Sequence, residues 1–353
     1  MSSNLPPATK KIDQIMKKIS LKNKKVFVAG HTGLVGQALC KRLEKENCKI
    51  LYINKKSLDL RDFNKTDKWL KLNKPDYIFI AAAHVGGILA NSSFPADFIY
   101  DNLSIAINLI HLSHKNNIKK VLYLGSSCIY PKFAKQPINE QSLLTGPLEP
   151  TNEWYAIAKI AGLKLCKAYA LQHKRNFISA MPTNLYGPGD NFDIKSGHVL
   201  PSLINKIHYA VKHNKKNVIL WGTGKPKREF LFVDDLSEAL VFLMKNYNKK
   251  DHVNVGSGIE VSILNLAKTI AKVIGFKGKF IFDTSKPDGT SRKFINSKKI
   301  NSLGWKSKIS LLKLLGSEII FSINVLTISL DTSSPLFIID SIFLPSSVWS
   351  LIS

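Results

Sequence analysis

Short continuous runs of hydrophobic residues recur through the first half of the chain, and stretches with helical spacing separate them. The runs are Lys25–Ala29, Lys49–Ile53, Tyr77–Ala83, Val121–Leu124 and Phe177–Met181. Strands buried on both faces show unbroken hydrophobic runs, and strands that alternate with helices form parallel sheets. The pattern therefore predicts an α/β fold built on a doubly wound parallel sheet.

The pattern changes after residue 187, where polar loops separate the hydrophobic segments. A helix is predicted over Leu200–Val211 and a strand over Val218–Trp221, which indicates a smaller C-terminal α/β lobe. The expected division is residues 1–24 as a basic extension, 25–187 with 230–257 as the large domain, 188–229 with 258–313 as the smaller lobe, and 314–353 as a tail rich in Ser and hydrophobic residues.

Charge and length limit the class of protein. The net charge is +26 over 353 residues, but only five of the 51 basic residues are arginine and the lysines are dispersed. Nucleic-acid readers more often cluster arginine with stacking aromatic residues, so nucleic acid is not an expected partner. No hydrophobic run reaches the ~20 residues of a membrane span. No secretory signal is present, so a cytoplasmic location is expected.

The four cysteines offer no metal or disulfide pattern. They lack C-x-x-C spacing. Neither a disulfide nor a zinc site is therefore expected, and no metal is assigned.

A glycine-rich turn follows the first predicted strand and precedes a predicted helix. Gly30, Gly33 and Gly36 have the spacing G-x-x-G-x-x-G. Such glycines allow a pyrophosphate to approach a helix N-terminus, where free N–H groups and the helix dipole favour anions. This context predicts a Rossmann-type dinucleotide site, in the variant associated with short-chain dehydrogenases.

The residues after the second predicted strand indicate which dinucleotide binds. An NAD-selective site places Asp or Glu there for the ribose hydroxyls. This chain has Asn54, Lys55 and Lys56 instead. Lysines suit a 2′-phosphate, so NADP(H) is the predicted cofactor and Lys55 the candidate phosphate ligand.

Three side chains able to act on a carbonyl are predicted to converge. Ser126 follows the hydrophobic run at Val121–Leu124, while Tyr155 and Lys159 are four residues apart in a predicted helix and share one face. An ammonium beside a phenol favours the phenolate, so Lys159 is expected to lower the Tyr155 pKa from its usual ~10. Tyr155 can then pass a proton to a carbonyl oxygen held by Ser126, as carbonyl reduction requires.

Several segments together resemble the GDP-L-fucose synthase family of extended short-chain dehydrogenase/reductases. They are Gly30–Gly36, Ala81–Ile88, Gly125–Pro137, Glu149–Leu165, Pro182–Pro188, Trp221–Asp235 and Lys286–Lys293. The resemblance extends from about Lys24 to about Leu312, and the motifs at Gly125–Pro131 and Pro182–Pro188 are specific within the superfamily.

The resemblance implies NADPH-dependent conversion of GDP-4-keto-6-deoxy-D-mannose to GDP-L-fucose, by epimerisation at C3 and C5 and then reduction of the C4 ketone. By motif, Cys128 and His198 move the epimerisation protons and Tyr155 donates the reduction proton. Lys159 activates Tyr155 and anchors the ribose, and Ser126 holds the carbonyl. Free Cys and His titrate near ~8.5 and ~6.5, which brackets neutral pH.

The resemblance also implies binding residues and an oligomeric state. NADP(H) would contact Gly30, Thr32, Gly33, Leu34, Val35, Gly36, Lys55, Ala82, Ser126, Tyr155, Lys159, Pro182, Asn184, Leu185 and His198. The GDP-sugar substrate would contact Lys206, Trp221, Arg228 and Asp288. Members of the family form homodimers through helices that correspond here to Pro95–Asn117 and Thr151–His173.

The chain departs from the family pattern in two places. Thr32 stands where some members carry an arginine for the cofactor phosphate, so the preference for NADP rests on Lys55. From Leu314 on, the sequence does not follow the family's C-terminal helix and contains neither Lys nor Arg.

Three alternatives to this function stay open. A different nucleotide-sugar epimerase or dehydratase of the same superfamily would retain NAD+ and oxidise no NADPH. A catalytically silent dinucleotide-sensing protein would not need Tyr155. A binder of nucleic acid or membrane surfaces driven by charge would show salt-dependent retention.

Overall fold

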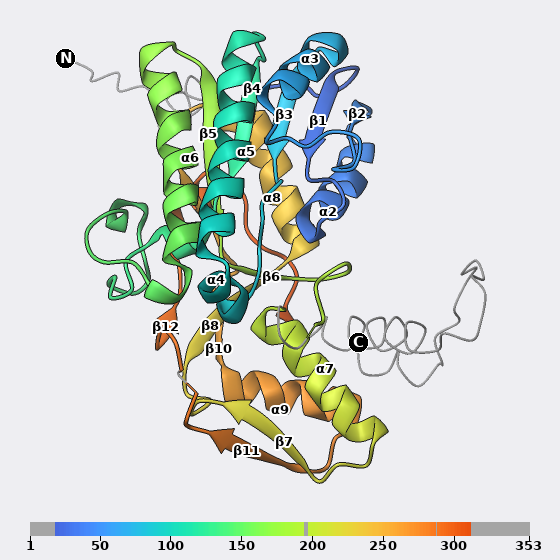
Figure 1. Cartoon of the computed structure of the whole chain (residues 1–353), viewed down its shortest axis with the longest axis vertical. Coiled ribbons are helices and arrows are strands. Elements are labelled where there is room, and N and C mark those ends of the chain that lie inside the picture. The colour runs from blue at the N-terminus through green and yellow to red at the C-terminus, as the bar shows by residue number, and fades with distance from the viewer. Residues whose placement is uncertain (1–17, 194–196, 287, 312–353) are drawn as a thin grey trace, which may run out of the picture.

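The computed structural model describes residues 18–193, 197–286 and 288–311 (Figure 1). A six-stranded parallel sheet runs in the order β2-β1-β3-β4-β5-β9. Its strands are β1 (Lys25–Ala29), β2 (Lys49–Leu51), β3 (Tyr77–Ile80), β4 (Lys120–Leu124), β5 (Asn176–Pro182) and β9 (Val253–Val255). The predicted doubly wound parallel sheet is confirmed.

Helices cover both faces of this sheet (Figure 1). The helices of the described residues are α2 (Leu34–Glu44), α3 (Phe63–Asn73), α4 (Ile88–Ser93), α5 (Pro95–Lys115), α6 (Glu153–Gln172), α7 (Val199–Lys212), α8 (Val233–Asn246), α9 (Ile263–Ile274) and α10 (Lys298–Ser302). The two faces carry α2 and α8 on one side and α3, α5 and α6 on the other. Val26 and Val28 pack in one core with α2 and α8, whereas Phe27 and Ile78 pack in another with α3, α5 and α6. Successive strand residues point to opposite faces, so burial of both faces explains the unbroken hydrophobic runs.

The carboxyl ends of the central strands lie along one edge of the sheet. Ala29 of β1 pairs with Ile80 of β3, and Leu124 of β4 pairs with Ala180 of β5. After β1 the chain forms β2 on one side and β3 on the other, so the strand order reverses beside β1. Ligands of open α/β sheets bind at such a switch point, outside the carboxyl ends.

Two smaller sheets build the rest of the molecule. Strand β8 (Lys227–Phe232) pairs with β6 (Asn184–Tyr186), β10 (Glu260–Ser262) and β12 (Arg292–Lys293), and β7 (Asn217–Trp221) pairs in parallel with β11 (Lys279–Asp283). Helices α7 and α9 pack with β7 and β11 around Ile207 and Ile270. Ser262 caps α9 by accepting from the Asn265 N–H at 3.1 Å, and Gly275 ends it in the left-handed conformation at φ 82°.

The structure corrects two expected boundaries. Leu21 is fully buried in the core of the large domain, and the Ile19 N–H donates to the Lys245 carbonyl at 2.8 Å, so residues from Ile19 on belong to the fold rather than to an extension. Residues 230–232 lie in β8, outside the large sheet, whereas α8 and β9 do return to it. Most of the expected extension and the whole of the expected tail lie outside the described residues.

A buried lysine fixes the amino end of β4 to α8. Lys120 is fully buried, and its Nζ lies within hydrogen-bond distance of the carbonyl oxygens of Leu243 (3.2 Å), Met244 (2.7 Å) and Tyr247 (2.5 Å). The Asn248 Oδ1 lies at 3.0 Å. These oxygens include C-terminal carbonyls of α8, which no helical N–H satisfies and which favour a cation. The amino end of β4 is thus fixed by a lysine amino group whose hydrogen bonds are all made to protein oxygens.

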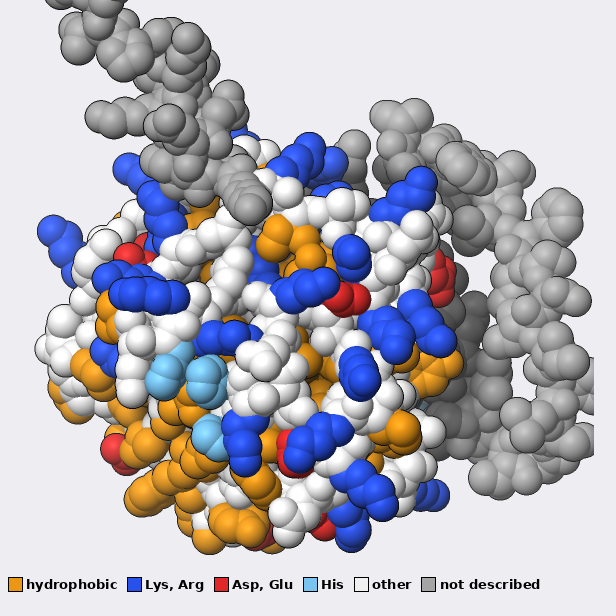
Figure 2. Space-filling model, turned by 90° about the horizontal axis from the view of Figure 1, so that it is seen from above, with side chains coloured by type: hydrophobic (Ala, Val, Ile, Leu, Met, Phe, Trp, Pro, Cys, Tyr) orange, Lys and Arg blue, Asp and Glu red, His pale blue; other side chains and the backbone are white. Residues whose placement is uncertain are grey.

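The surface carries its charge in a dispersed way. Figure 2 shows Lys and Arg side chains scattered over the face seen from above, with hydrophobic side chains gathered at one side beside histidines. Within the described ranges, no helix combines the length and hydrophobicity needed to cross a bilayer.

Candidate active site

The glycine turn after β1 brings two backbone segments into contact. A Cβ on Gly30, whose φ is +87°, would lie 2.6 Å from the backbone of Ala82. A Cβ on Gly36 would lie 2.0 Å from the Gly30 carbonyl oxygen. These two positions therefore require glycine. Gly33 differs, since its Cβ would make only an ordinary contact at 3.6 Å.

The N-terminus of α2 points out of this turn and is suited to an anion. Gly33 is its N-cap, no side chain caps it, and no acidic residue stands in its first turn. The first N–H groups of a helix have no intrahelical partner, so those of Leu34, Val35 and Gly36 can donate to a pyrophosphate. Thr32 contributes a backbone carbonyl that accepts from Gln37 Nε2 at 2.7 Å. The residues present fit a dinucleotide phosphate.

Lys55 lies in the turn after β2, the strand next to β1. Its side chain is exposed. The pKa of the nearby Asp59 carboxyl is lowered, mainly by the Arg61 hydrogen bond and to a smaller extent by the charge of Lys55. Lys55 thus lies exposed in the turn after β2, near Asp59.

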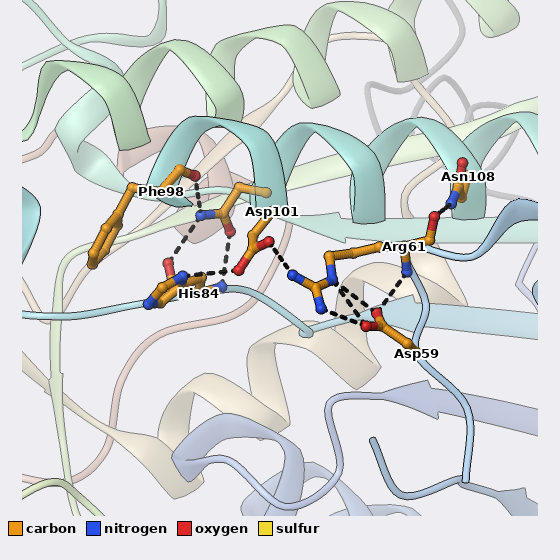
Figure 3. A network of polar contacts seen from close by, with 7 residues as sticks. Asp59, Arg61, His84, Phe98, Asp101 and Asn108 are labelled. Atoms are coloured by element: carbon orange, nitrogen blue, oxygen red, sulfur yellow. Dashed lines mark hydrogen bonds and ion pairs between the residues drawn. The ribbon is translucent and has the colours of Figure 1, made fainter. Parts of the chain in front are cut away.

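A polar network fixes the loops that follow β2 and β3 (Figure 3). Arg61 donates to Asp59 and, at 2.5 Å, to Asp101 on α5. The other oxygen of Asp101 lies 3.0 Å from His84 Nδ1, and the Asn102 amide joins both backbone groups of His84 at 3.0 and 2.9 Å. The segment that contains Ala82 is thereby tied to the long helix α5, which holds it against Gly30.

Ser126 and Cys128 follow β4 in a short 3-10 helix, η1 (Ser127–Ile129). The Ser126 Oγ accepts from the Cys128 N–H at 3.3 Å. Cys128 is buried, with 6% of its surface exposed. The sharp turn places a hydroxyl and a thiol next to each other at the carboxyl edge of the sheet.

Tyr155 and Lys159 lie on α6 and face η1. The Lys159 ammonium donates to the Leu124 carbonyl at 2.9 Å and lies 5.5 Å from the centre of the Tyr155 ring. Burial lowers the Lys159 pKa to about 8. The predicted helical spacing thus places both side chains at the end of β4.

The expected effect of Lys159 on Tyr155 is wrong for this structure. Burial, and next the charge of Cys128, raise the Tyr155 pKa instead of lowering it. Desolvation disfavours a phenolate, because a buried charge loses its hydration. At neutral pH the phenol therefore retains its proton, which is the form that a proton donor needs.

Cys128 and His198 also differ from their free pKa values. Burial raises the Cys128 pKa, while Lys293, the Ser126 hydrogen bond and Lys159 act in the opposite direction. His198 is the N-cap of α7 and is exposed, yet desolvation by the protein around it and then the charge of Lys293 lower its pKa. Both groups are shifted towards their neutral forms, and both lie within the field of one ammonium.

The predicted substrate residues form a connected set in the smaller lobe. The Lys206 Nζ lies 4.7 Å above the Trp221 ring, and Trp221 is 44% exposed. Asp288 accepts from the Thr223 backbone N–H at 2.6 Å and from its hydroxyl at 2.8 Å, which fixes it beside Trp221. The charge of Asp288 acts on Arg228, whose pKa is lowered mainly by burial.

Pro182, Asn184 and Leu185 lie where the chain leaves β5 for β6. The Asn184 amide donates to the Glu229 carbonyl at 2.8 Å, and Leu185 pairs with Leu231. They connect the large sheet to β8, and so to the residues of the smaller lobe.

Comparison with known proteins identifies the family. The model of the NAD dependent epimerase/dehydratase family matches residues 26–256. The chain belongs to this family.

Its relatives include GDP-L-fucose synthases, as the sequence predicts. The GDP-L-fucose synthase of Sinorhizobium fredii is 54% identical over 291 residues, which are 82% of this chain and 93% of that one. The putative GDP-L-fucose synthase 2 of Arabidopsis thaliana is 56% identical over 82% of this chain and 89% of its own. The crystal structure of a GDP-L-fucose synthetase from Naegleria fowleri bound to NADP has a TM-score of 0.80 and 30% identity, over 88% of this chain and 97% of that one.

Sequence reasoning missed two charged residues of this epimerase/dehydratase site. Lys293 ends β12 and acts on Cys128, His198 and Arg228. Glu149 accepts from Thr290 at 3.1 Å and pairs with Lys132 at 3.2 Å beside the same thiol. In a chain this rich in lysine, no spacing distinguishes Lys293, and only the pairing of β12 with β8 brings it to the site.

Proposed function

We propose that this chain converts GDP-4-keto-6-deoxy-D-mannose to GDP-L-fucose, with epimerisation at C3 and C5 followed by NADPH reduction of the C4 ketone. The observation that carries the proposal is the convergence, at the carboxyl edge of the large sheet, of Ser126, Cys128, Tyr155 and Lys159, in a chain of this family. The predicted substrate residues Lys206, Trp221, Arg228 and Asp288 support it. When bound, the cofactor supplies the hydride.

The reduction needs a proton and a hold on the carbonyl oxygen. Tyr155 retains its proton at neutral pH because its pKa is raised, and it can deliver that proton to the oxygen as the hydride arrives at C4. The Ser126 hydroxyl, fixed next to η1, holds the same oxygen. Lys159 has a pKa of about 8, so its ammonium stabilises the phenolate left behind.

The epimerisation uses the acidity of carbons beside the ketone. Removing a proton from C3 or C5 leaves an enolate, whose oxygen is held by the same Ser126 and Tyr155. Cys128 and His198 are the groups that take one proton and return another to the opposite face. The charge of the Lys293 ammonium lowers the pKa of both groups, which supports placing them at one sugar ring.

The proposal extends to the GDP group and the cofactor phosphate. Trp221 offers an exposed aromatic face, and Lys206 and Arg228 supply the positive charge that a diphosphate needs. Asp288 fixes the turn that carries Trp221. Lys55 binds the 2′-phosphate of NADPH, since the residues directly after β2 as far as Lys56 include no acid, and the nearby Asp59 is hydrogen-bonded to Arg61.

We also propose a cytoplasmic homodimer paired through α5 and α6. These helices expose Tyr100, Ile107, Trp154 and Leu171, and Figure 2 shows hydrophobic side chains gathered at one side of the molecule. Exposed hydrophobic patches commonly mark protein interfaces. Light scattering of the purified chain should give twice the mass of one chain. The Ile107→Lys variant should give the mass of a single chain.

The decisive experiment mixes the protein with NADPH and the keto sugar and follows the absorbance of reduced nicotinamide. Loss of the reduced band with formation of GDP-L-fucose supports the proposal. Interconversion of sugars without net NADPH oxidation would favour another epimerase or dehydratase of the superfamily. Absence of any reaction, with dinucleotide binding retained, would favour the sensing protein.

A further inference from the structure

Strand β12 carries a lysine to the centre of the site. Lys293 stands opposite Arg228 in the parallel pairing of β12 with β8. The residue before it, Arg292, donates to Glu260 at 2.7 Å and lines the same cavity as Lys293 and Cys128. The fold thus directs the Lys293 side chain towards the catalytic residues.

Lys293 and Cys128 line the same small cavity. Its volume is about 30 Å³, and its wall also includes Glu149, Thr290 and Lys132. Burial, the largest influence, lowers the Lys293 pKa, and the charge of Cys128 raises it. The thiol and the ammonium therefore face one enclosed space and influence each other.

The Lys293 ammonium has no fixed partner in the part of the chain that the structure describes: no hydrogen bond or ion pair engages it. Its neighbours differ. Lys132 pairs with Glu149 at 3.2 Å, and Arg292 pairs with Glu260 at 2.7 Å. Lys293 is partly buried. An unpaired cation that has lost part of its hydration is costly, so its presence beside a thiol indicates a role in chemistry rather than in stability.

The charged groups near Cys128 include Lys132, Glu149 and Arg292, which line the same cavity. Helix α6 contributes Lys159 and Tyr155, β4 contributes Tyr123, and η1 contributes the Ser126 hydroxyl. Lys159 is already hydrogen-bonded to the Leu124 carbonyl. Of the two cations among the described residues that act on the thiol, Lys293 has the larger influence and Lys159 the smaller.

We propose that Lys293 is a positioning residue of the epimerisation, whose ammonium opposes the effect of burial on Cys128 and favours formation of the thiolate that removes the sugar proton. The inference rests on the proposed function. As the S–H bond forms, the C–H bond breaks, and its electron pair moves into the enolate held by Ser126. His198 in its protonated form returns a proton to the opposite face. Cys128 later releases its proton to solvent and His198 regains one from solvent, so the protons balance and no redox step occurs. Because a cation disfavours imidazolium, Lys293 also makes His198 a stronger proton donor.

The first test measures the thiol without any substrate. The pH dependence of Cys128 alkylation by iodoacetamide, followed by peptide mass spectrometry, gives its pKa. Lys293→Met should raise that pKa by roughly one unit, because an opposite charge nearby favours the ionised form. In Lys293→Arg the pKa should return most of the way to the wild-type value. Lys132→Met removes a paired lysine from the same cavity and should leave the Cys128 pKa unchanged. An unshifted pKa in Lys293→Met would overturn the proposal, whatever the enzyme's substrate.

The second test links the charge to the reaction. In Lys293→Met, solvent deuterium should enter C3 and C5 at least tenfold more slowly at neutral pH, and the deficit should shrink as pH rises, because the thiolate then forms without help. Reduction of an already epimerised ketone should change much less. A deficit equal at every pH, or equal for reduction, would contradict the role in thiolate formation. If the keto sugar is not a substrate, the alkylation result still decides whether Lys293 controls Cys128. Lys293→Gln replaces Lys293→Met if the latter does not fold.

Discussion

The two ends of β4 use polar side chains in opposite ways. At the amino end, the Lys120 amino group is surrounded by four oxygen acceptors, three of them backbone carbonyls near the end of α8. At the carboxyl end, Ser126, Cys128 and Lys293 have few partners or none within the described chain. A polar group whose hydrogen bonds are all made within the protein can only stabilise the fold, whereas a polar group with hydrogen bonds still to make can bind a ligand.

The difference follows from the architecture. At the amino end of β4, the end of α8 supplies the carbonyls that offset the loss of water of the buried Lys120 amino group. At the carboxyl end, Cys128 and Lys293 line a small cavity, in the region where open α/β sheets bind ligands. Substitutions at the two ends should therefore separate stability from chemistry.

The largest effect is expected from Tyr155→Phe, which removes one oxygen at the carboxyl end. NADPH oxidation with the keto sugar should fall by about 10²–10⁴-fold, because the reduction loses its proton donor. The midpoint of thermal unfolding should change little. Normal turnover in this variant would remove Tyr155 from the mechanism.

Lys120→Met makes the corresponding change at the amino end. It leaves the carbonyls near the end of α8 without a donor, so the free energy of unfolding should fall by about 3 kcal/mol in urea titrations. The activity of the remaining folded protein should be preserved. Lys119→Met is the matched control, since Lys119 is an exposed neighbour paired with Asp76, and should cost little.

Cys128→Ser should affect the two reactions proposed for the site, epimerisation and reduction, to different extents. Solvent deuterium entry at C3 and C5 should slow by about 10²-fold, because the hydroxyl is a far weaker acid than the thiol. Reduction of an epimerised ketone should be slowed much less. Equal losses in both assays would show that Cys128 is not dedicated to epimerisation.

Lys55→Ala is expected to have the smallest effect, at the exposed edge beside β2. The preference for NADPH over NADH should fall by about tenfold, as the loss of one charge-assisted hydrogen bond predicts. The measurement is the ratio of kcat/KM for the two cofactors, with Lys56→Ala as the control. An unchanged ratio would place the 2′-phosphate elsewhere.

Local sequence was enough to predict the large domain. The unbroken hydrophobic runs gave the parallel strands, Gly30 and Gly36 proved sterically necessary, and the spacing of Tyr155 and Lys159 placed both on one helix face. These features depend on neighbours within a few residues, where backbone geometry follows directly from residue type. The resemblance to a known family, rather than any physical pattern, supplied Cys128 and His198.

What only the tertiary structure decided are properties that depend on distant contacts. Burial reversed the expected direction of the Tyr155 pKa, because desolvation depends on everything packed around the phenol. The burial of Leu21 in the core and the position of β8 outside the large sheet both depend on contacts between residues far apart in the chain. Lys293 reached the thiol in the same way, by a strand register that no local pattern encodes.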